Sequence, residues 1–225
     1  MPSAYFIAGT DTEIGKTFTT CALLHTARRA GLSAIGMKPV AAGAEWRDGA
    51  WVNEDAARLR SASSIDPGLA DLNPVCLRTP VAPHIAAAIE QVSIAPATIL
   101  DAFARLRAQA DLVLVEGVGG FRVPLTDTFD TADLAVALDL PVILVVGMRL
   151  GCINHALLTA EAIAARGLTL AGWVANQIDP DMQCVSENRH ALAQRLGAPC
   201  LGHVPFNPDN DPAAVCALVL PTPDR

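Results

Sequence analysis

Apolar residues along the chain form two patterns, short continuous runs and stretches in which they recur at helical spacing. The continuous runs predict buried strands, over residues 5–8, 34–37, 111–116, 141–147, 170–176 and 200–204. Helical spacing predicts helices, over residues 17–30, 53–59, 83–91, 96–109, 131–139, 154–166 and 183–196. Because strands and helices alternate, the pattern predicts an α/β fold in which a mostly parallel sheet carries helices on both faces.

The first strand, helix and second strand form a βαβ unit, so we expect these two strands to be parallel neighbours. Two stretches lack a regular pattern. Residues 41–52 are rich in Gly and Ala and predict a loop, while the proline-rich residues 65–83 predict an irregular excursion over one end of the sheet. No repeat or linker divides the chain, so residues 1–225 are expected to form a single domain.

Composition agrees with a well-buried sheet, since 52% of the residues are hydrophobic and 17% are charged. A net charge of −7 leaves no broad basic surface, which argues against nucleic acid as a partner. Six cysteines without a C-x-x-C pair indicate reduced thiols in a cytoplasmic protein. No signal peptide is recognised, and the longest apolar run, residues 141–147, is too short to cross a membrane.

The first strand leads into a P-loop. A glycine-rich turn follows residues 5–8, and Gly15, Lys16 and Thr17 open the first predicted helix. In such a loop backbone N–H groups cradle phosphates, the lysine meets the β- and γ-phosphate oxygens, and the hydroxyl binds Mg²⁺. The helix N-terminus adds its free donors and its dipole. The fold class is therefore P-loop NTPase-like, with nucleotide binding as the predicted function.

Two features of this loop are unusual. The first glycine of the motif is Gly9, one residue earlier than the pattern requires, and Thr10 stands in its place. Two acids, Asp11 and Glu13, lie where nucleotide phosphates would be repelled. Either the motif match is accidental or the acids serve a particular chemistry.

Further candidates follow other strands. Glu116 ends an apolar strand and suits the acid that completes a Mg²⁺ shell, the alternative being a solvated strand end. Asp55, in the first turn of a helix, is a weaker metal-ligand candidate that could simply favour the helix dipole. Lys38 follows the strand that we expect beside the P-loop strand, so its ammonium would reach the phosphates and an additional anion; a surface Lys-Pro turn is the alternative. Arg149 and His155 are interpreted as solvated, and nothing in the sequence activates Cys152.

Five segments together resemble the dethiobiotin synthetase family over nearly the whole chain. They comprise the P-loop variant with both acids and four other strings, at residues 9–17, 38–40, 115–120, 150–155 and 172–176. The resemblance implies a homodimer with the active site at its interface, and 7,8-diaminopelargonate, CO₂ and MgATP as substrates. One amine would capture CO₂ as a carbamate, the carbamate would attack the γ-phosphate, and the second amine would displace phosphate from the mixed anhydride and close a ureido ring.

The resemblance also implies residue roles. Lys38, Lys16 and Thr12 would be catalytic, and Thr17, Asp55 and Glu116 would hold Mg²⁺. ATP-binding residues would be Glu13, Ile14, Gly15, Lys16, Thr17, Phe18, Asp55, Glu116, Gly117, Val118, Gly119, Asn176, Gln177, Pro205, Phe206 and Asn207. Substrate-binding residues would be Thr12, Lys38, Ala42, Leu150, Gly151 and Asn154, the 150–154 turn coming from the other subunit. Relatives often carry hydroxyl residues where this chain has Ala42 and Ala82, so substrate positioning should be modestly weaker here.

The competing interpretation is a partner-regulated ATPase switch of the partitioning type, which shares the fold. Those proteins carry a signature lysine where this chain has Asp11, and they often end in an amphipathic membrane-binding helix that residues 220–225 do not resemble. A third interpretation, an amidotransferase-type synthetase acting on a corrin carboxylate, would require a glutaminase domain for which 225 residues leave no room.

Overall fold

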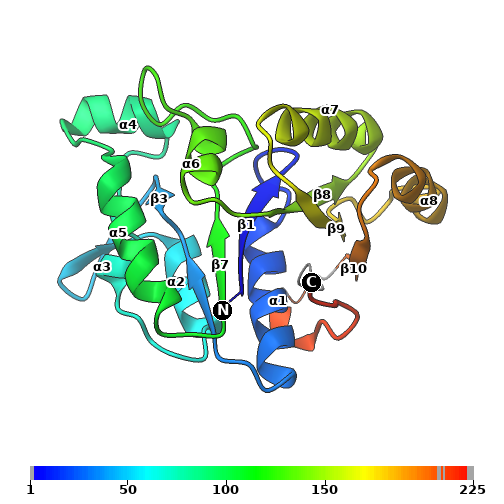
Figure 1. Ribbon diagram of the computed structural model, residues 1–225, viewed down its shortest axis with the longest axis horizontal. Coiled ribbons are helices and arrows are strands. Elements are labelled where there is room, and N and C mark those ends of the chain that lie inside the picture. The colour runs from blue at the N-terminus through cyan, green and yellow to red at the C-terminus, as the bar shows by residue number, and fades with distance from the viewer. Residues whose placement is uncertain (1–2, 207–208, 210, 222–225) are drawn as a thin grey trace.

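The computed structural model describes residues 3–206, 209 and 211–221. Its centre is a six-stranded sheet in which every neighbouring pair is parallel, in the order β10-β9-β8-β1-β7-β2 (Figure 1). The strands are β1 (Ser3–Gly9), β2 (Ala34–Met37), β7 (Leu112–Glu116), β8 (Val142–Met148), β9 (Leu170–Gln177) and β10 (Cys200–Val204). The predicted α/β class with a mostly parallel sheet is confirmed.

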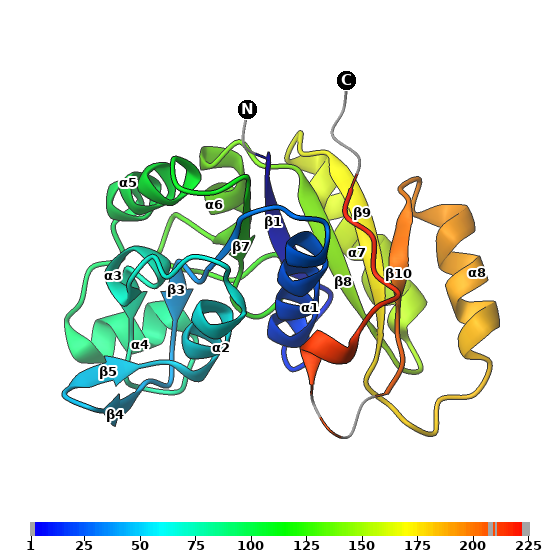
Figure 2. The same cartoon turned by 90° about the horizontal axis from the view of Figure 1, so that it is seen from below.

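Helices cover both faces of this sheet, as predicted. Because side chains alternate along a strand, Phe6 of β1 points into one core cluster and Ile7 into the other. The first cluster contains residues of α5, α6, α7 and α8, and the second contains residues of α1 and α2 (Figure 2). The helices are α1 (Lys16–Arg29), α2 (Glu54–Ala62), α3 (Leu69–Leu72), α4 (Pro83–Glu90), α5 (Pro96–Arg107), α6 (Thr131–Ala137), α7 (Cys152–Ala165) and α8 (Val185–Arg195), with a 3₁₀ turn η1 (Pro212–Ala214).

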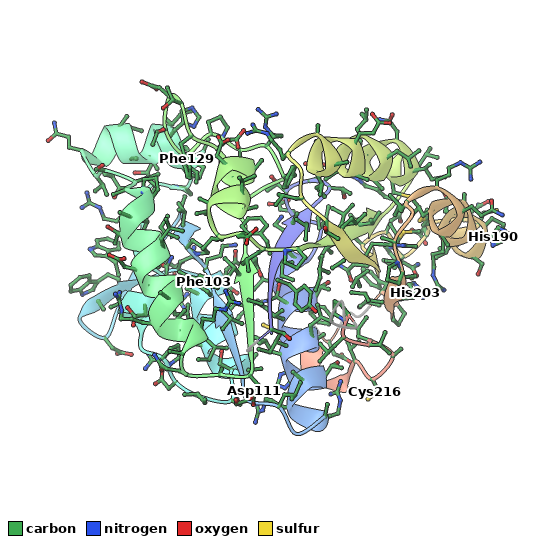
Figure 3. The ribbon with its side chains drawn as sticks, in the orientation of Figure 1. Phe103, Asp111, Phe129, His190, His203 and Cys216 are labelled. Carbon is green, nitrogen blue, oxygen red and sulfur yellow. The ribbon has the colours of Figure 1, made fainter. Side chains whose placement is uncertain are left out.

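The first two strands run parallel, as expected, but the expectation that they are neighbours is wrong. β7 lies between β1 and β2, pairing with β1 on one side and with β2 on the other. All five residues of β7 are buried, as suits a strand with neighbours on both edges. At its start, Asp111 (labelled in Figure 3) accepts hydrogen bonds from Ser33 N at 2.9 Å and Ser33 Oγ at 2.6 Å, which ties β2 to β7. Lys38 therefore follows the strand next to Glu116, not the strand next to the P-loop.

The predicted loop over residues 41–52 is also wrong in part, because it contains an antiparallel hairpin of β4 (Glu45–Arg47) and β5 (Ala50–Val52). Asp48 and Gly49 form its turn with φ of 48° and 85°. Asp-Gly is a preferred pair for a two-residue turn that requires positive φ at both positions, so the sequence did carry the signal.

The proline-rich segment 65–83 contains α3 and β6 (Val75–Cys76), the latter paired in parallel with β3 (Val40–Ala41). These short elements connect the end of β2 to the segment before α4.

Helix α7 begins two residues earlier than predicted. It starts at Cys152, after Gly151, which has a left-handed conformation with φ of 94°. Among the residues that the structure describes, no helix is both long and apolar enough to span a membrane.

Candidate active site

The P-loop wraps around the Lys16 side chain at the carboxyl end of β1. Gly15 precedes α1 with φ of 77° and ψ of 33°, and Lys16 Nζ donates a hydrogen bond of 3.0 Å to Asp11 O. Only glycine fits at position 15, because a Cβ there would stand 2.2 Å from Asn176 Nδ2. Lys16 is buried, and its ammonium is held within the loop that would receive phosphate.

A cluster of charged groups lies beside this loop, where β2 and β7 end. Lys38 Nζ donates hydrogen bonds to Glu116 Oε1 at 2.6 Å, Asp55 Oδ2 at 2.9 Å and Gly117 O at 3.2 Å. Thr17 Oγ1 donates to the same Glu116 Oε1 at 2.6 Å. Lys38 is 3% exposed and Glu116 is fully buried. The sequence contains two lysines, and both lie in this site.

The protonation states of these groups depend on one another. Burial by itself would lower the pKa of Lys38, but the charges of Glu116 and Asp55 outweigh it and raise that pKa above its ordinary value. Burial likewise acts to raise the pKa of Asp55, yet the Lys38 charge holds it below its usual range. For Lys16, burial and then the Lys38 charge lower the pKa to about 8. The site therefore contains a firmly charged lysine beside one whose pKa is lowered to about 8.

Two residues that sequence reasoning missed hold this cluster in place. Thr20 Oγ1, three residues after Thr17 on the same face of α1, lies 2.8 Å from Glu116 Oε2. That spacing could have identified it. Asn73 Nδ2 donates to Lys38 O at 2.7 Å, from a segment whose sequence gives no comparable signal.

The predicted metal ligands fit a magnesium ion by their chemistry. The Thr17 hydroxyl and the Asp55 and Glu116 carboxylates come from different elements and supply the hard oxygen donors that Mg²⁺ prefers. Mg²⁺ usually binds through one or two carboxylates together with substrate phosphates, so a larger cluster is unnecessary. In the part of the chain that the structure describes, no group of three or more His, Cys, Asp or Glu side chains is arranged to hold a metal.

A cavity of about 270 Å³ opens next to the P-loop and brings most of the predicted base-binding residues together. It is lined by Glu13, Gly15, Phe18, Asn176, Gln177, Ile178, Val204, Pro205 and Phe206, of which Ile178 and Val204 were not predicted. Asn176 also supports the loop, since its Nδ2 donates to Ile14 O at 2.8 Å. The predicted residue Asn207 lies outside the described residues.

The loop after Glu116 lies against the tip of the P-loop. A Cβ on Gly119, which has φ of 64°, would stand 3.5 Å from Thr12 Oγ1 and 2.9 Å from Val123 Cγ2. Val118 packs against the larger core cluster. Ala42 lies next to the start of α2, where its carbonyl accepts a hydrogen bond of 3.1 Å from the Asn53 side chain.

The turn before α7 is tied to the P-loop. Arg149 Nη2 donates to Asp11 Oδ2 at 2.5 Å, so the interpretation of Arg149 as merely solvated is wrong. Leu150 is 95% exposed, and Gly151 and Asn154 are exposed too. No contact between this turn and Lys38 of the same chain is observed among the described residues.

Comparison with known proteins gives matches over almost the whole chain. A family model described as "AAA domain" (AAA_26) matches residues 3–214. A curated protein of Aromatoleum aromaticum named ATP-dependent dethiobiotin synthetase BioD is 72% identical over 221 residues, covering 98% of both chains. A protein of the same name from Xanthomonas oryzae pv. oryzae is 55% identical over 213 residues, covering 95% of both.

More distant solved structures share the fold. A ParA family ATPase from Chlorobium tepidum superposes with a TM-score of 0.57 at 13% identity, covering 93% of this chain and 87% of that one. The septum site-determining protein MinD from Pyrococcus horikoshii gives the same TM-score at 16% identity, again covering 93% and 87%. At such low identity the likeness concerns the fold alone.

Proposed function

Since this chain belongs to the ATP-dependent dethiobiotin synthetase family, we propose that it is a cyclo-ligase of biotin biosynthesis, converting 7,8-diaminopelargonate, CO₂ and ATP into dethiobiotin, ADP and phosphate. The observation that carries the proposal is the second lysine of the site. Lys38 lies buried against Glu116 and Asp55 beside the P-loop, although Lys16 and a metal ion would suffice to neutralise a nucleotide. A second ammonium is needed where a further anion meets the γ-phosphate.

The further anion is a carbamate, formed when one substrate amine attacks CO₂ and releases a proton. Its oxygen attacks the γ-phosphate, and the bond from that phosphorus to the bridging oxygen breaks to release ADP. The second amine then attacks the carbonyl carbon of the mixed carbamic–phosphoric anhydride, expels phosphate and closes the ureido ring. Each step needs two reactants held in line, which positioning by the protein favours.

Lys16 and Lys38 bring the carbamate and the γ-phosphate together and stabilise the charge that spreads over the phosphoryl oxygens. Thr12, at the tip of the loop, contacts the carbamate end of the substrate. Mg²⁺, held by Thr17, Asp55 and Glu116, would neutralise the phosphate oxygens when bound.

The base of the nucleotide occupies the cavity beside the P-loop, where the amides of Asn176 and Gln177 read its edge while Pro205 and Phe206 cover its face. This arrangement places the phosphates at Gly15 and the N-terminus of α1, where free backbone N–H groups bind anions. The lining of the cavity by both amides supports the assignment.

The active enzyme is a homodimer in which the turn of residues 150–154 completes the partner's site. The almost complete exposure of Leu150 supports this assembly, because burying its apolar side chain against the partner subunit would be favourable. The N-terminus of α7, next to Leu150, carries free N–H groups suited to the substrate carboxylate. We further propose that the chain works as one domain in the cytoplasm, where its cosubstrate ATP is available, without nucleic-acid or membrane partners.

The alternative of a partner-regulated ATPase switch is not favoured. Its support is the fold shared with ParA and MinD at 13% and 16% identity, whereas the synthetase relatives reach 72% and 55%. The loop position where switch ATPases carry a lysine holds Asp11, which is paired with Arg149.

Phosphate release and product formation by the purified protein test this function. With MgATP present, both should require bicarbonate and the diamine, because the carbamate is the nucleophile. Equal phosphate release without the diamine would overturn the ligase assignment and favour an ATPase.

The shared active site has a separate test. Lys38→Ala and Asn154→Ala, each impaired alone, should restore about a quarter of wild-type activity when coexpressed, since half of the dimers then contain one intact site made from both chains. No recovery would contradict a site built from two subunits.

A further inference from the structure

Lys38 stands where the metal ion is expected. Its ammonium contacts Glu116 Oε1 at 2.6 Å and Asp55 Oδ2 at 2.9 Å, and these carboxylates are the two charged ligands proposed for Mg²⁺. The third ligand, the Thr17 hydroxyl, lies 2.6 Å from the same Glu116 Oε1. All of the proposed metal ligands therefore contact Lys38 or share an acceptor oxygen with it.

An ammonium and a divalent cation would compete for these two carboxylates. Mg²⁺ binds carboxylate oxygens at about 2.0–2.1 Å, so a metal on Glu116 Oε1 would lie within about 5 Å of Lys38 Nζ, which is 2.6 Å from the same oxygen. Water would screen that repulsion poorly, because Lys38 is 3% exposed and Glu116 is fully buried. The repulsion therefore weakens the hold of the two carboxylates on each cation when the other is present.

Lys38 also has little freedom to remain nearby without a new partner. Its other contact is Gly117 O at 3.2 Å, and Lys16 occupies the phosphate side of the site. The two ammonium groups repel each other, which contributes to the lowered pKa of Lys16. An anion entering between the two lysines would give Lys38 the partner it needs.

We propose that Lys38 serves as an internal cation that exchanges with the divalent metal. Lys38 neutralises Glu116 and Asp55 where it contacts them, and it moves to the substrate anion when the metal takes over these carboxylates. The inference rests on the proposed function for the identity of that anion, while the competition between lysine and metal rests on the contacts alone. Metal and anion therefore bind cooperatively. The metal releases Lys38 to the anion, and the anion draws Lys38 away from the carboxylates that bind the metal.

The affinity of the nucleotide-free protein for Mn²⁺, measured from its electron paramagnetic resonance signal, tests the exchange. Replacing Lys38 by methionine removes the competing charge while keeping a long side chain, so the variant should bind Mn²⁺ roughly tenfold more tightly or better than wild type. Lys16→Met is the matched control, because it removes the same charge from a lysine that does not contact either carboxylate. The increase in Mn²⁺ affinity of Lys16→Met should be clearly smaller than that of Lys38→Met.

The proposal would be overturned if Lys38→Met increased the affinity for Mn²⁺ by less than roughly tenfold. It would also be overturned if Lys16→Met increased that affinity equally. No substrate is present, so this result is independent of whether the protein forms dethiobiotin. If the wild-type protein forms no dethiobiotin but the Mn²⁺ affinities differ as expected, the ligase function alone is refuted. If it forms dethiobiotin but the Mn²⁺ affinities do not differ, the exchange alone is refuted.

A second measurement uses the wild-type protein, in case the buried Glu116 prevents Lys38→Met from folding. Lysine labelled with ¹³C at Cε gives two side-chain signals, because the chain contains two lysines. A non-hydrolysable ATP analogue with EDTA should move the Lys16 signal and leave that of Lys38 in place, and added Mg²⁺ should then move the Lys38 signal. Movement of the Lys38 signal before Mg²⁺ is added, or none afterwards, would contradict the exchange.

Discussion

The side chain of Lys16 lies directly against the backbone of Gly9. A Cβ on Gly9 would stand 2.8 Å from Lys16 Cδ and 3.0 Å from Lys16 Nζ. Glycine at position 9 therefore leaves room for the lysine, which a Cβ there would push aside. The loop holds an extra residue between its first glycine and Gly15, and this contact shows that Gly9 nevertheless adjoins the lysine of the motif.

Gly9→Ala should weaken nucleotide binding without unfolding the protein. The new methyl group would force the flexible Lys16 side chain to move, and a hydrogen bond to a charged group is worth about 1.5–3 kcal/mol, so the dissociation constant of a non-hydrolysable ATP analogue should rise roughly tenfold or more. Isothermal titration calorimetry measures it. Gly120→Ala is the control, since the nearest atom to its Cβ would be Gly9 O at 3.8 Å. An equal loss of affinity in both variants would show that Lys16 is not the cause.

The sequence predicted the fold class because buried parallel strands give continuous apolar runs, whereas it could not give the strand order. A βαβ unit fixes the direction of its two strands, but another strand can enter between them, as β7 does between β1 and β2. That insertion is what brings Glu116 next to Lys38. The hairpin at Asp48-Gly49 is a different case, because its turn signal was present in the sequence and was not used.

The site residues also differ in whether the sequence could predict them. Residues held by a local motif, such as Gly15 and Lys16, could be predicted from sequence because the loop itself fixes their geometry. Thr20 carried a weaker signal through its spacing from Thr17. Asn73 carried none, since its hydrogen bond to Lys38 O depends on how an irregular segment folds back over the end of β2.

Thr20→Val should both destabilise the protein and lower its turnover number. The change leaves the fully buried Glu116 Oε2 without this donor, and an unsatisfied buried acceptor costs about 1–3 kcal/mol. Urea denaturation measures the stability and product formation measures the turnover. Thr26→Val provides the comparison on the same helix, because its hydroxyl donates to Ala22 O and accepts from Arg29 Nη2 but contacts no carboxylate. If both variants behave alike, the hydrogen bond to Glu116 has no special role.

Lys38→Ala should nearly abolish dethiobiotin formation while nucleotide binding persists through Lys16 and the loop backbone. Removing one group that stabilises transition-state charge lowers the turnover number by roughly 10²–10³-fold. Single-turnover product formation and the affinity for an ATP analogue are the two measurements. Thermal unfolding of the variant shows whether it is folded, and Lys38→Met replaces it if it is not. Ring closure at the wild-type rate would remove Lys38 from the mechanism.

Nucleotide binding should weaken as the pH rises through about 8, the lowered pKa of Lys16. Below that pH the ammonium is already charged, whereas above it phosphate binding must first take up a proton, which costs about 1.4 kcal/mol per pH unit. The dissociation constant of the ATP analogue should therefore rise up to about tenfold per unit above pH 8. Lys16→Arg stays charged and should lack this slope. A wild-type affinity that does not change between neutral pH and pH 9 would contradict the lowered pKa.

Ala82→Ser should stabilise the protein, because position 82 is the N-cap of α4. Ala82 has φ of −55° and ψ of 138° and offers no side-chain acceptor to the first turn, which opens with Pro83. A serine hydroxyl there would accept a hydrogen bond from a backbone N–H, and the gain in free energy of unfolding should be about 0.5–2 kcal/mol.

Ala95→Ser is a matched control at the N-cap of α5, which also lacks a side-chain cap and is followed by proline. Both variants should gain stability in urea denaturation, and the Michaelis constant for the diamine should be unchanged in Ala95→Ser. A lower Michaelis constant in Ala82→Ser would then report a substrate contact in addition to the cap, while no gain in stability at position 82 would refute the capping role.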